Sequence, residues 1–442
     1  MSRVPHLAAS LVLLFGISPL AAQPTYELRG GAWWNGTSFE PREMYSVESV
    51  FTSPRPARVD SVIDLSGMFV VPPYGEAHTH TVAYVPSRTV ELLEDGVFYA
   101  LILNVGREAI GRGITRFNRR HSLDVSFAAA GVTASDGHPM QIMTRRGATA
   151  EDLDGDWVTV VETEADLEAK WGDLRAANPD VVKVFLLYSE RYEERHGNPD
   201  IPDRYRGMNP ALVPAIVRRA HRDGLRVAAH VRTAHDFHVA VEAGVDVVAH
   251  LPGFSMGPAA EADMGDPDRL ADVEHPEWFR IDPADAERAA RSGITVITTI
   301  GRVDPIGELP PSVPEGPRRL LERLLTARRE VLTANLRLLK EHGVTLAAGS
   351  DAGEGSPVTE VLELDRLAVF SPAELLNMLT RDAARVIFPG RSAGRLEDGF
   401  EASFLALSAD PTERLENLRS IELRFKQGAP LDLEAAARIA AP

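Results

Sequence analysis

The strongest constraint on the fold is a unit that repeats through the middle of the chain, a short apolar run followed by an amphipathic helix. The run that begins at Val181 precedes a helix that Asn209 can cap, with Pro210 in its first turn and Gly224 at its end. Further apolar runs follow, with helical segments between them, at 225–230, 245–250, 293–299 and 343–351. Such alternation predicts parallel strands buried on both faces. Eight units need about 250 residues, so we predict a (β/α)8 TIM barrel in an α/β protein.

The two ends of the chain have a different pattern, with short β-like runs separated by Gly, Asn and Pro at turn positions. Residues 23–70 and 388–442 both have it, and we predict that they form one small β-sandwich domain. The predicted barrel then spans 71–387.

The first 22 residues are typical of an export signal. Arg3 supplies a positive charge, Leu7–Leu20 is apolar, and small residues precede Gln23. We therefore expect residues 1–22 to be removed and the mature protein to be periplasmic or secreted. No later apolar run reaches the ~20 residues of a membrane span, so we expect no membrane association after removal.

Composition narrows the classes of partner and of chemistry. The chain has no cysteine, which excludes disulfides, zinc knuckles and thiol nucleophiles. Its formal charge of −17 repels phosphate backbones, so we expect no nucleic acid as a partner. The oligomeric state stays open, with a homo-oligomer as one alternative, because the pattern alone identifies no exposed apolar face.

Polar residues with the chemistry of metal ligands stand at the carboxyl ends of five apolar runs, where barrel enzymes carry their catalytic groups. They are His78, His80, Lys183, His230, His250 and Asp351. Each alone has an ordinary explanation, such as a hydrogen-bonded core histidine or a turn aspartate. Their order and spacing together predict one site.

Lys183 is the least ordinary of the six, because it interrupts an apolar strand. Burying an unpaired ammonium is expensive, so this lysine loses its proton, finds a counter-charge or is chemically changed. A lysine that reaches the solvent at the mouth of the barrel is the simpler alternative.

The ordered series from His78-x-His80 to Asp351 resembles the amidohydrolase superfamily of metal-dependent barrel hydrolases. Within it, the chain looks most like the secreted imidazolonepropionase-like and prolidase-like branch, from about Tyr26 to Gly428. The chain departs from the family pattern before the H-x-H motif, where Glu76 stands in place of the usual aspartate.

The resemblance implies a ligand set. His78, His80 and Asp351 would hold one ion, and His230 and His250 a second. Lys183, carboxylated by CO2 on Nζ, would bridge the two ions as a carbamate. Two Zn2+ ions suit these ligands, with Mn2+, Co2+ or Fe2+ as substitutes.

The implied reaction is hydrolysis of a C–N bond in a small-molecule substrate, such as an amide, a lactam or a small peptide. A hydroxide that bridges the metals would attack the carbonyl, and Asp351 would transfer the proton to the leaving nitrogen. Three further residues are candidate substrate contacts: His138 after the third strand, Tyr188 after the fourth and Arg232 after the fifth.

Two alternatives stay open. One is a mononuclear, deaminase-type member of the superfamily with an unmodified lysine. The other is a secreted barrel that binds a ligand without turning it over.

Overall fold

The computed structural model describes residues 23–144, 147–201, 205–253, 275–301, 315–351 and 355–441. The proposed export signal, residues 1–22, lies outside this part of the chain. Among the described helices, none combines the length and the apolar character that crossing a bilayer requires.

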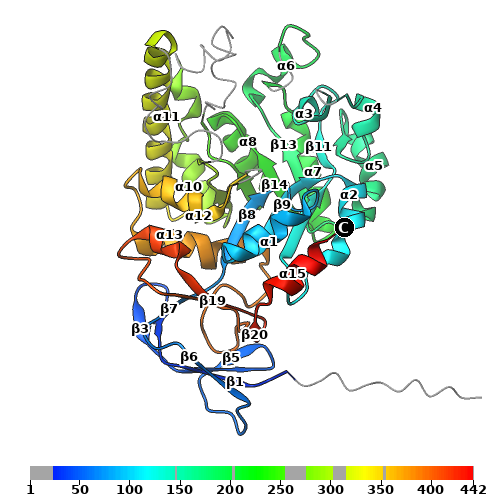
Figure 1. The fold of residues 1–442 in the computed structure, drawn as a ribbon. Helices are drawn as coiled ribbons and strands as arrows, with labels where there is room; N and C mark the ends of the chain where they lie inside the picture. The colour runs from blue at the N-terminus through cyan, green and yellow to red at the C-terminus, as the bar shows by residue number, and fades with distance from the viewer. Residues whose placement is uncertain are drawn as a thin grey trace, which may run out of the picture.

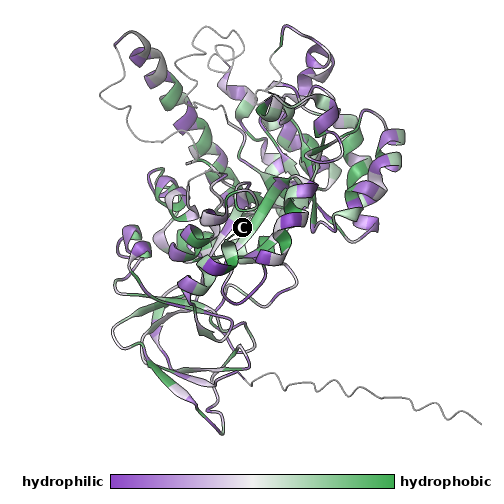
Figure 2. Ribbon diagram, turned by 45° about the vertical axis from the view of Figure 1, so that its right-hand side comes forward, coloured by the Kyte–Doolittle hydropathy of each residue, from purple (hydrophilic) through white to green (hydrophobic). Residues whose placement is uncertain are grey.

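The middle of the chain forms parallel strands surrounded by helices, as in a TIM barrel (Figure 1). These strands are β8 Tyr74–Thr79, β9 Val97–Val105, β10 Asp124–Ala129, β11 Gly131–Thr133, β12 Val158–Val160, β13 Val181–Phe185, β14 Arg226–His230, β15 Val247–Ala249, β16 Thr295–Ile297 and β17 Thr345–Ala347. All nine residues of β9 and all five of β13 are buried, as expected for strands covered on both faces. Figure 2 shows the hydrophobic strands inside and the hydrophilic helix faces outside.

Strand pairing divides these strands into two parallel sheets, whereas we predicted one closed barrel. The first sheet has the order β10-β9-β8, and the second β12-β11-β13-β14-β15-β16-β17. The division falls at Ala130, whose φ of 49° interrupts the extended backbone between β10 and β11. A residue in the left-handed region ends a regular strand, and no local sequence signal marks this one.

The described helices are α1 Pro86–Glu94, α2 Arg107–Gly113, α3 Met140–Thr144, α4 Ala150–Leu153, α5 Glu164–Ala176, α6 Tyr192–Arg195, α7 Val213–Arg222, α8 Ala234–Ala243, α10 Pro283–Arg291, α11 Glu315–Glu341, α12 Pro357–Asp365, α13 Pro372–Asn377, α14 Ala383–Ile387 and α15 Leu433–Ala440. The predicted cap Asn209 accepts a hydrogen bond from the Ala211 amide and opens a 3-10 turn that leads into α7. Helix α11 rises beside the parallel strands in Figure 1.

Below the barrel, strands from both ends of the chain share one sheet with the order β20-β19-β18-β7-β2-β3, and a second sheet has the order β5-β4-β1-β6. These strands are β1 Tyr26–Arg29, β2 Ala32–Trp34, β3 Phe39–Pro41, β4 Met44–Val47, β5 Val50–Thr52, β6 Ser61–Asp64, β7 Phe69–Val71, β18 Phe404–Leu407, β19 Ile421–Lys426 and β20 Ala429–Pro430. The register pairs Val71 on β7 with Leu405 on β18.

A buried charge cluster joins this sheet to the barrel. Lys426 Nζ on β19 lies 2.8 Å from Asp124 Oδ1 on β10, and both side chains are at most 1 % exposed. The second oxygen of Asp124 pairs with Arg391 at 2.6 Å and accepts a hydrogen bond from Gln427. Charges taken this far from water need partners, and here each has one.

Candidate functional site

Five of the six predicted ligands lie at the carboxyl ends of parallel strands or in the residues that follow, and Lys183 is the middle residue of its strand. The six are His78 in β8, His80 directly after it, Lys183 in β13, His230 at the end of β14, His250 directly after β15, and Asp351 after β17.

Three of the six bring their donor atoms into one coordination sphere. His78 Nε2 and His80 Nε2 lie 3.1 Å apart. Asp351 Oδ1 is 3.1 Å from His80 Nε2 and 3.7 Å from His78 Nε2. Ligands ~2.0 Å from a tetrahedral zinc ion are separated by ~3.3 Å, so the spacing suits a metal ion. Within the described residues this trio forms the group of potential ligands that converges within 4.8 Å.

The other two histidines adjoin this trio. The His250 ring centroid lies 4.7 Å from that of His78 and 4.5 Å from that of His230. His250 Nε2 is 3.9 Å from Asp351 Oδ2. Four imidazoles and one carboxylate therefore occupy one continuous site.

Lys183 is 1 % exposed, and its Nζ has no hydrogen-bond partner among the described residues. Burial lowers the pKa of this amine to about 7, although Asp351 favours the charged form. A neutral amine therefore makes up about half of the population near pH 7.

The electrostatics of the histidines favour metal binding. Burial lowers the pKa of His78 and of His230 well below the ordinary value, and the neighbouring His250 lowers both further. These rings are neutral at physiological pH, which is the form that binds metals. Neutral imidazoles, a carboxylate and an unpartnered amine fit the divalent metals that the amidohydrolase pattern implies.

Contacts on the far ring nitrogens orient two of the ligands. His80 Nδ1 lies 3.1 Å from the main-chain oxygen of Asn104, and His250 Nδ1 lies 2.7 Å from Thr299 Oγ1. Such contacts fix the tautomer and the direction of a metal-binding ring. Sequence reasoning missed Asn104 and Thr299, although the rule that found the histidines, a polar residue near a strand end, would have found both.

A buried glutamate ties the first and last strands of the site together. Glu76 accepts hydrogen bonds from the His78 amide at 3.0 Å, from the Ser350 amide at 2.8 Å and from Ser350 Oγ at 2.6 Å. Burial raises the pKa of Glu76 to about 7, against the effect of these hydrogen bonds. Glu76 thus holds the backbone next to Asp351 against the backbone of His78.

Asp236 organises the loops after β13 and β14. It accepts hydrogen bonds from the amides of Tyr188, Ser189, Arg232 and Thr233 at 2.9 to 3.1 Å. Thr233 and Asp236 form a capping box at the start of α8, a pattern that the sequence Thr233-Ala-His-Asp236 predicts. The carboxylate that caps the helix also shapes two loops at the site.

The three candidate substrate residues lie in different surroundings. The His138 ring centroid is 4.9 Å from that of His230, which brings it to the site. Tyr188 is fully buried, with the Arg195 guanidinium 4.2 Å from its ring centroid and Tyr205 packed beside it. Arg232 is partly buried, and its main chain contacts Asp236 and Gly253.

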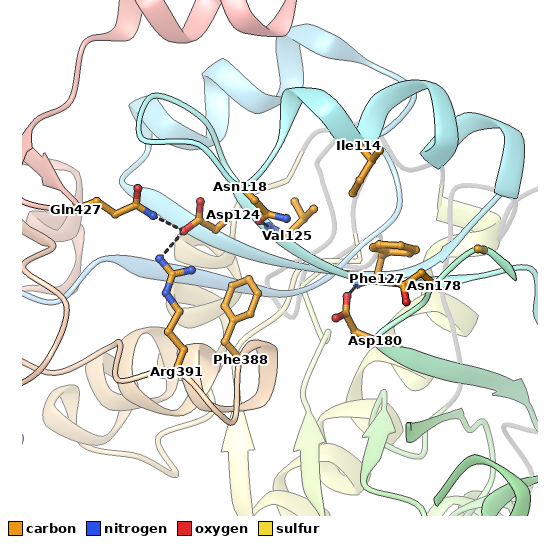
Figure 3. A pocket seen from close by; sticks show the side chains of 11 residues that line it. Ile114, Asn118, Asp124, Val125, Phe127, Asn178, Asp180, Phe388, Arg391 and Gln427 are labelled. Carbon is orange, nitrogen blue, oxygen red and sulfur yellow. Dashed lines mark hydrogen bonds and ion pairs between the residues drawn. The ribbon is translucent and has the colours of Figure 1, made fainter. Parts of the chain in front are cut away.

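A cavity of about 630 Å³ lies elsewhere (Figure 3). Asp124 and Asp180, among its lining residues, stand at or before the amino-terminal starts of β10 and β13, whereas the histidines stand at carboxyl ends. Asp124 is bound by Arg391 and Gln427, and Asp180 accepts a hydrogen bond from the Phe127 amide. This hollow is therefore part of the junction below the barrel and separate from the candidate site.

The chain resembles the crystal structure of an amidohydrolase with a TM-score of 0.66 and 18 % identity, over 92 % of this chain and 98 % of that one. It also resembles a prolidase in complex with N-methylphosphonate-L-proline, with a TM-score of 0.66 and 16 % identity over 92 % of this chain and 99 % of that one. A third similar structure is the ochratoxinase of A. niger, with a TM-score of 0.67 and 16 % identity over 92 % of this chain and 96 % of that one.

No curated protein matches the chain in sequence. The sequence model of the amidohydrolase family matches residues 127–425, which is more than half of the chain. Together with the TIM-barrel-like fold, this match shows that the chain belongs to the amidohydrolase family and is a hydrolase that acts on carbon–nitrogen bonds.

Proposed function

We propose that this enzyme hydrolyses an amide, lactam or small-peptide bond at a site that holds two divalent metal ions. The observation that supports this most directly is the convergence of His78, His80 and Asp351, with His250 and His230 adjoining them. Water is added across the C–N bond, giving a carboxylic acid and an amine.

The residues present divide into ligands and proton carriers. His78, His80 and Asp351 would hold one ion, and His230 and His250 the other. Bound divalent metals supply Lewis acidity and lower the pKa of water, which provides a nucleophile at neutral pH. Asp351, 4 % exposed and between His80 and His250, takes the proton of the attacking water and returns it to the leaving nitrogen.

Lys183 would complete the ligand set as a carbamate. Its neutral amine attacks CO2, a N–C bond forms, and one proton leaves to solvent. The product carries two oxygens and a negative charge, so the buried amine would become an anionic group with the chemistry of a metal ligand. The unpartnered Nζ and its pKa of about 7 support this assignment.

Substrate recognition belongs to the loops after the strands. His138, beside His230, would contact the scissile carbonyl, with Tyr188 and Arg232 as further candidates on the β13 and β14 loops. The names prolidase and ochratoxinase among the structural neighbours favour amides of amino acids as a first test. Dipeptides, including those ending in proline, and N-acyl amino acids form the starting panel.

One observation favours a second candidate function. Only His78, His80 and Asp351 converge within a single coordination sphere among the described residues, which suits a mononuclear, deaminase-type enzyme. The reading as a non-catalytic binding barrel is set aside, because the family is one of hydrolases.

Metal content with and without Lys183 distinguishes the two candidates. We expect about two ions per chain when the protein is prepared with bicarbonate, and fewer in Lys183→Ala, with Lys340→Ala as the control. Amide cleavage of the panel should fall with the metal content. One ion, unaffected by the loss of Lys183, would favour the mononuclear enzyme and ammonia-releasing substrates. No bound metal in a folded protein offered zinc and manganese would contradict both.

We also infer that the parallel strands close into a barrel above a separate small domain. Two hydrogen bonds between β8 and the segment after β17 support closure, Ala77 N to Ala348 O at 3.1 Å and Asp351 N to His78 O at 2.8 Å. Slow hydrogen exchange at the Asp351 amide is expected, and fast exchange would contradict closure. The strands of both chain ends that share one sheet support our proposed domain division, 23–70 with 388–442 against 71–387.

Export to the periplasm or the medium is a further proposal, supported by Arg3 and the apolar stretch Leu7–Leu20. Amino-terminal sequencing of the protein from the producing cell should find Gln23 first. A chain that retains Met1 inside the cell would contradict it.

A further inference from the structure

A strained turn follows β16 and faces the site. Thr299 has a φ of 45°, in the left-handed region, where a β-branched residue is a clear outlier. His250, which it contacts, has a φ of 84°. Strain of this kind persists only where surrounding contacts hold it, and it gathers at functional sites.

Glu360 on α12 supplies those contacts. Its carboxylate accepts hydrogen bonds from Thr298 Oγ1 at 2.5 Å, from the Ile300 amide at 2.8 Å and from the Gly301 amide at 2.7 Å. These three donors lie on both sides of Thr299. Glu360 is 1 % exposed, so little water competes for its oxygens.

A second helix supports the same turn. Arg328 on α11 donates from Nη2 to the main-chain oxygen of Ile300 at 2.8 Å. Ile300 is therefore bound on both sides, its amide by Glu360 and its carbonyl oxygen by Arg328. The turn is fixed from two helices, and Thr299 has little freedom to leave its strained conformation.

The turn presents one hydroxyl to one candidate ligand. Thr299 Oγ1 lies 2.7 Å from His250 Nδ1, while His250 Nε2 faces Asp351 at 3.9 Å. A neutral imidazole carries a proton on only one nitrogen. If the Nδ1 proton is donated to Thr299, the lone pair of the ring is on Nε2, the nitrogen that faces Asp351.

We propose that Glu360 is a positioning residue that acts through Thr299. It holds the Thr298–Gly301 turn so that Thr299 Oγ1 accepts the Nδ1 proton of His250 and sets both the tautomer and the direction of the ring. The consequence for metal affinity rests on the proposed function, whereas the consequence for the tautomer does not.

The first measurement is the tautomer of His250 in the metal-free protein, by NMR of ¹⁵N-histidine-labelled chains. A His250→Gln spectrum assigns the signal. Wild type and Thr299→Ser should show the Nδ1–H tautomer, because both keep the hydroxyl. Thr299→Val, of similar shape, and Glu360→Gln, which replaces one acceptor oxygen with an NH2 group, should show a mixture. Thr326→Val and Glu330→Gln on exposed positions of α11 are matched controls.

The second measurement is titration with Co2+, followed by absorbance, for the same variants. Thr299→Val and Glu360→Gln should bind the ion at the site 10- to 100-fold more weakly, the usual effect of losing such a contact. Thr299→Ser should stay within a few-fold of wild type, which a general loss of structure would not allow.

An unchanged His250 tautomer in either Thr299→Val or Glu360→Gln, with circular dichroism showing a folded protein, would overturn the proposal. If the tautomer changes in the two variants and the wild-type protein binds no Co2+, the positioning role is supported and the metal-dependent function is contradicted. The two ideas can therefore fail separately.

Discussion

Individual residues of the site are constrained by backbone contact as much as by chemistry. Gly349 shows this most directly. A Cβ there would lie 2.7 Å from Ile297 Cγ2, 2.8 Å from the His78 amide nitrogen and 3.0 Å from His78 Cβ. The segment that carries Asp351 reaches His78 only because this position has no side chain.

We predict that Gly349→Ala moves Asp351 away from the two histidines. Overpacking of this kind costs about 1–3 kcal/mol of stability, and we expect metal affinity to fall by at least tenfold as well. Urea unfolding and metal titration measure the two effects. Gly390→Ala, where nothing lies within 4 Å, is the control and should change neither. Unaltered metal binding in Gly349→Ala would show that this close approach is unimportant.

Glu360 predicts a pH dependence of stability. Burial raises its pKa from 4.5 to about 7, against the hydrogen bonds and Arg328, which lower it. Between these two values the folded chain holds a proton that the unfolded chain has lost, so stability falls as pH rises. The contribution is complete below pH 4.5 and is lost above pH 7, and amounts to at most about 3 kcal/mol.

Urea unfolding of wild type and Glu360→Gln at pH 5 and pH 8 isolates this contribution. The wild type should lose more stability than the variant between the two values, since glutamine does not titrate. Glu330→Gln should behave as wild type. An equal loss in wild type and Glu360→Gln would mean that the buried carboxyl has an ordinary pKa.

At the scale of elements, local patterns were predictable and long-range pairings were not. The capping box of α8 and the Asn209 cap depend on residues within three positions of one another, and both are present. The strand ends that carry the histidines followed from buried apolar runs. The support of Thr299 by Glu360 joins residues distant in sequence, and no pattern along the chain specifies which helix reaches which turn. The division at Ala130 likewise depends on the neighbouring strands.

The buried ion pair between β10 and β19 predicts a large loss of stability when its carboxylate is replaced by an amide. Asp124→Asn would remove the negative charge 2.8 Å from the buried Lys426 ammonium, whose other contact is the neutral Arg119 carbonyl oxygen at 3.0 Å. We expect a loss of about 3–5 kcal/mol. Lys426→Met in the same chain should restore part of it, because the unpaired charge is removed. Thermal and urea unfolding measure both.

An exposed ion pair is the control for that prediction. Glu108 and Arg112 in α2 keep 73 % and 67 % of their side chains exposed. Glu108→Gln should change stability by less than about 1 kcal/mol, as is usual for pairs in water. A comparable small effect for Asp124→Asn would mean that the junction tolerates an unpaired cation.

The whole molecule should respond to metal through its folding equilibrium. A metal that binds only the folded chain stabilises it by about 2.7 kcal/mol at a hundredfold excess over Kd. We therefore expect the midpoint of thermal unfolding to rise by a few degrees with zinc or manganese and to return with a chelator. His80→Ala should abolish the rise, whereas His221→Ala, at a half-exposed position on α7, should preserve it. A rise retained in His80→Ala would place the metal elsewhere.

The sheet shared by both chain ends also has a consequence during synthesis. Val71 on β7 pairs with Leu405 on β18. During synthesis β7 therefore cannot pair with β18 until residues up to about 407 have left the ribosome. Until then the nascent protein presents an open strand edge, which readily pairs with other chains. Contacts so distant in sequence also slow folding. The yield of this protein in a cell therefore depends on how well that edge is shielded while the ribosome finishes the chain.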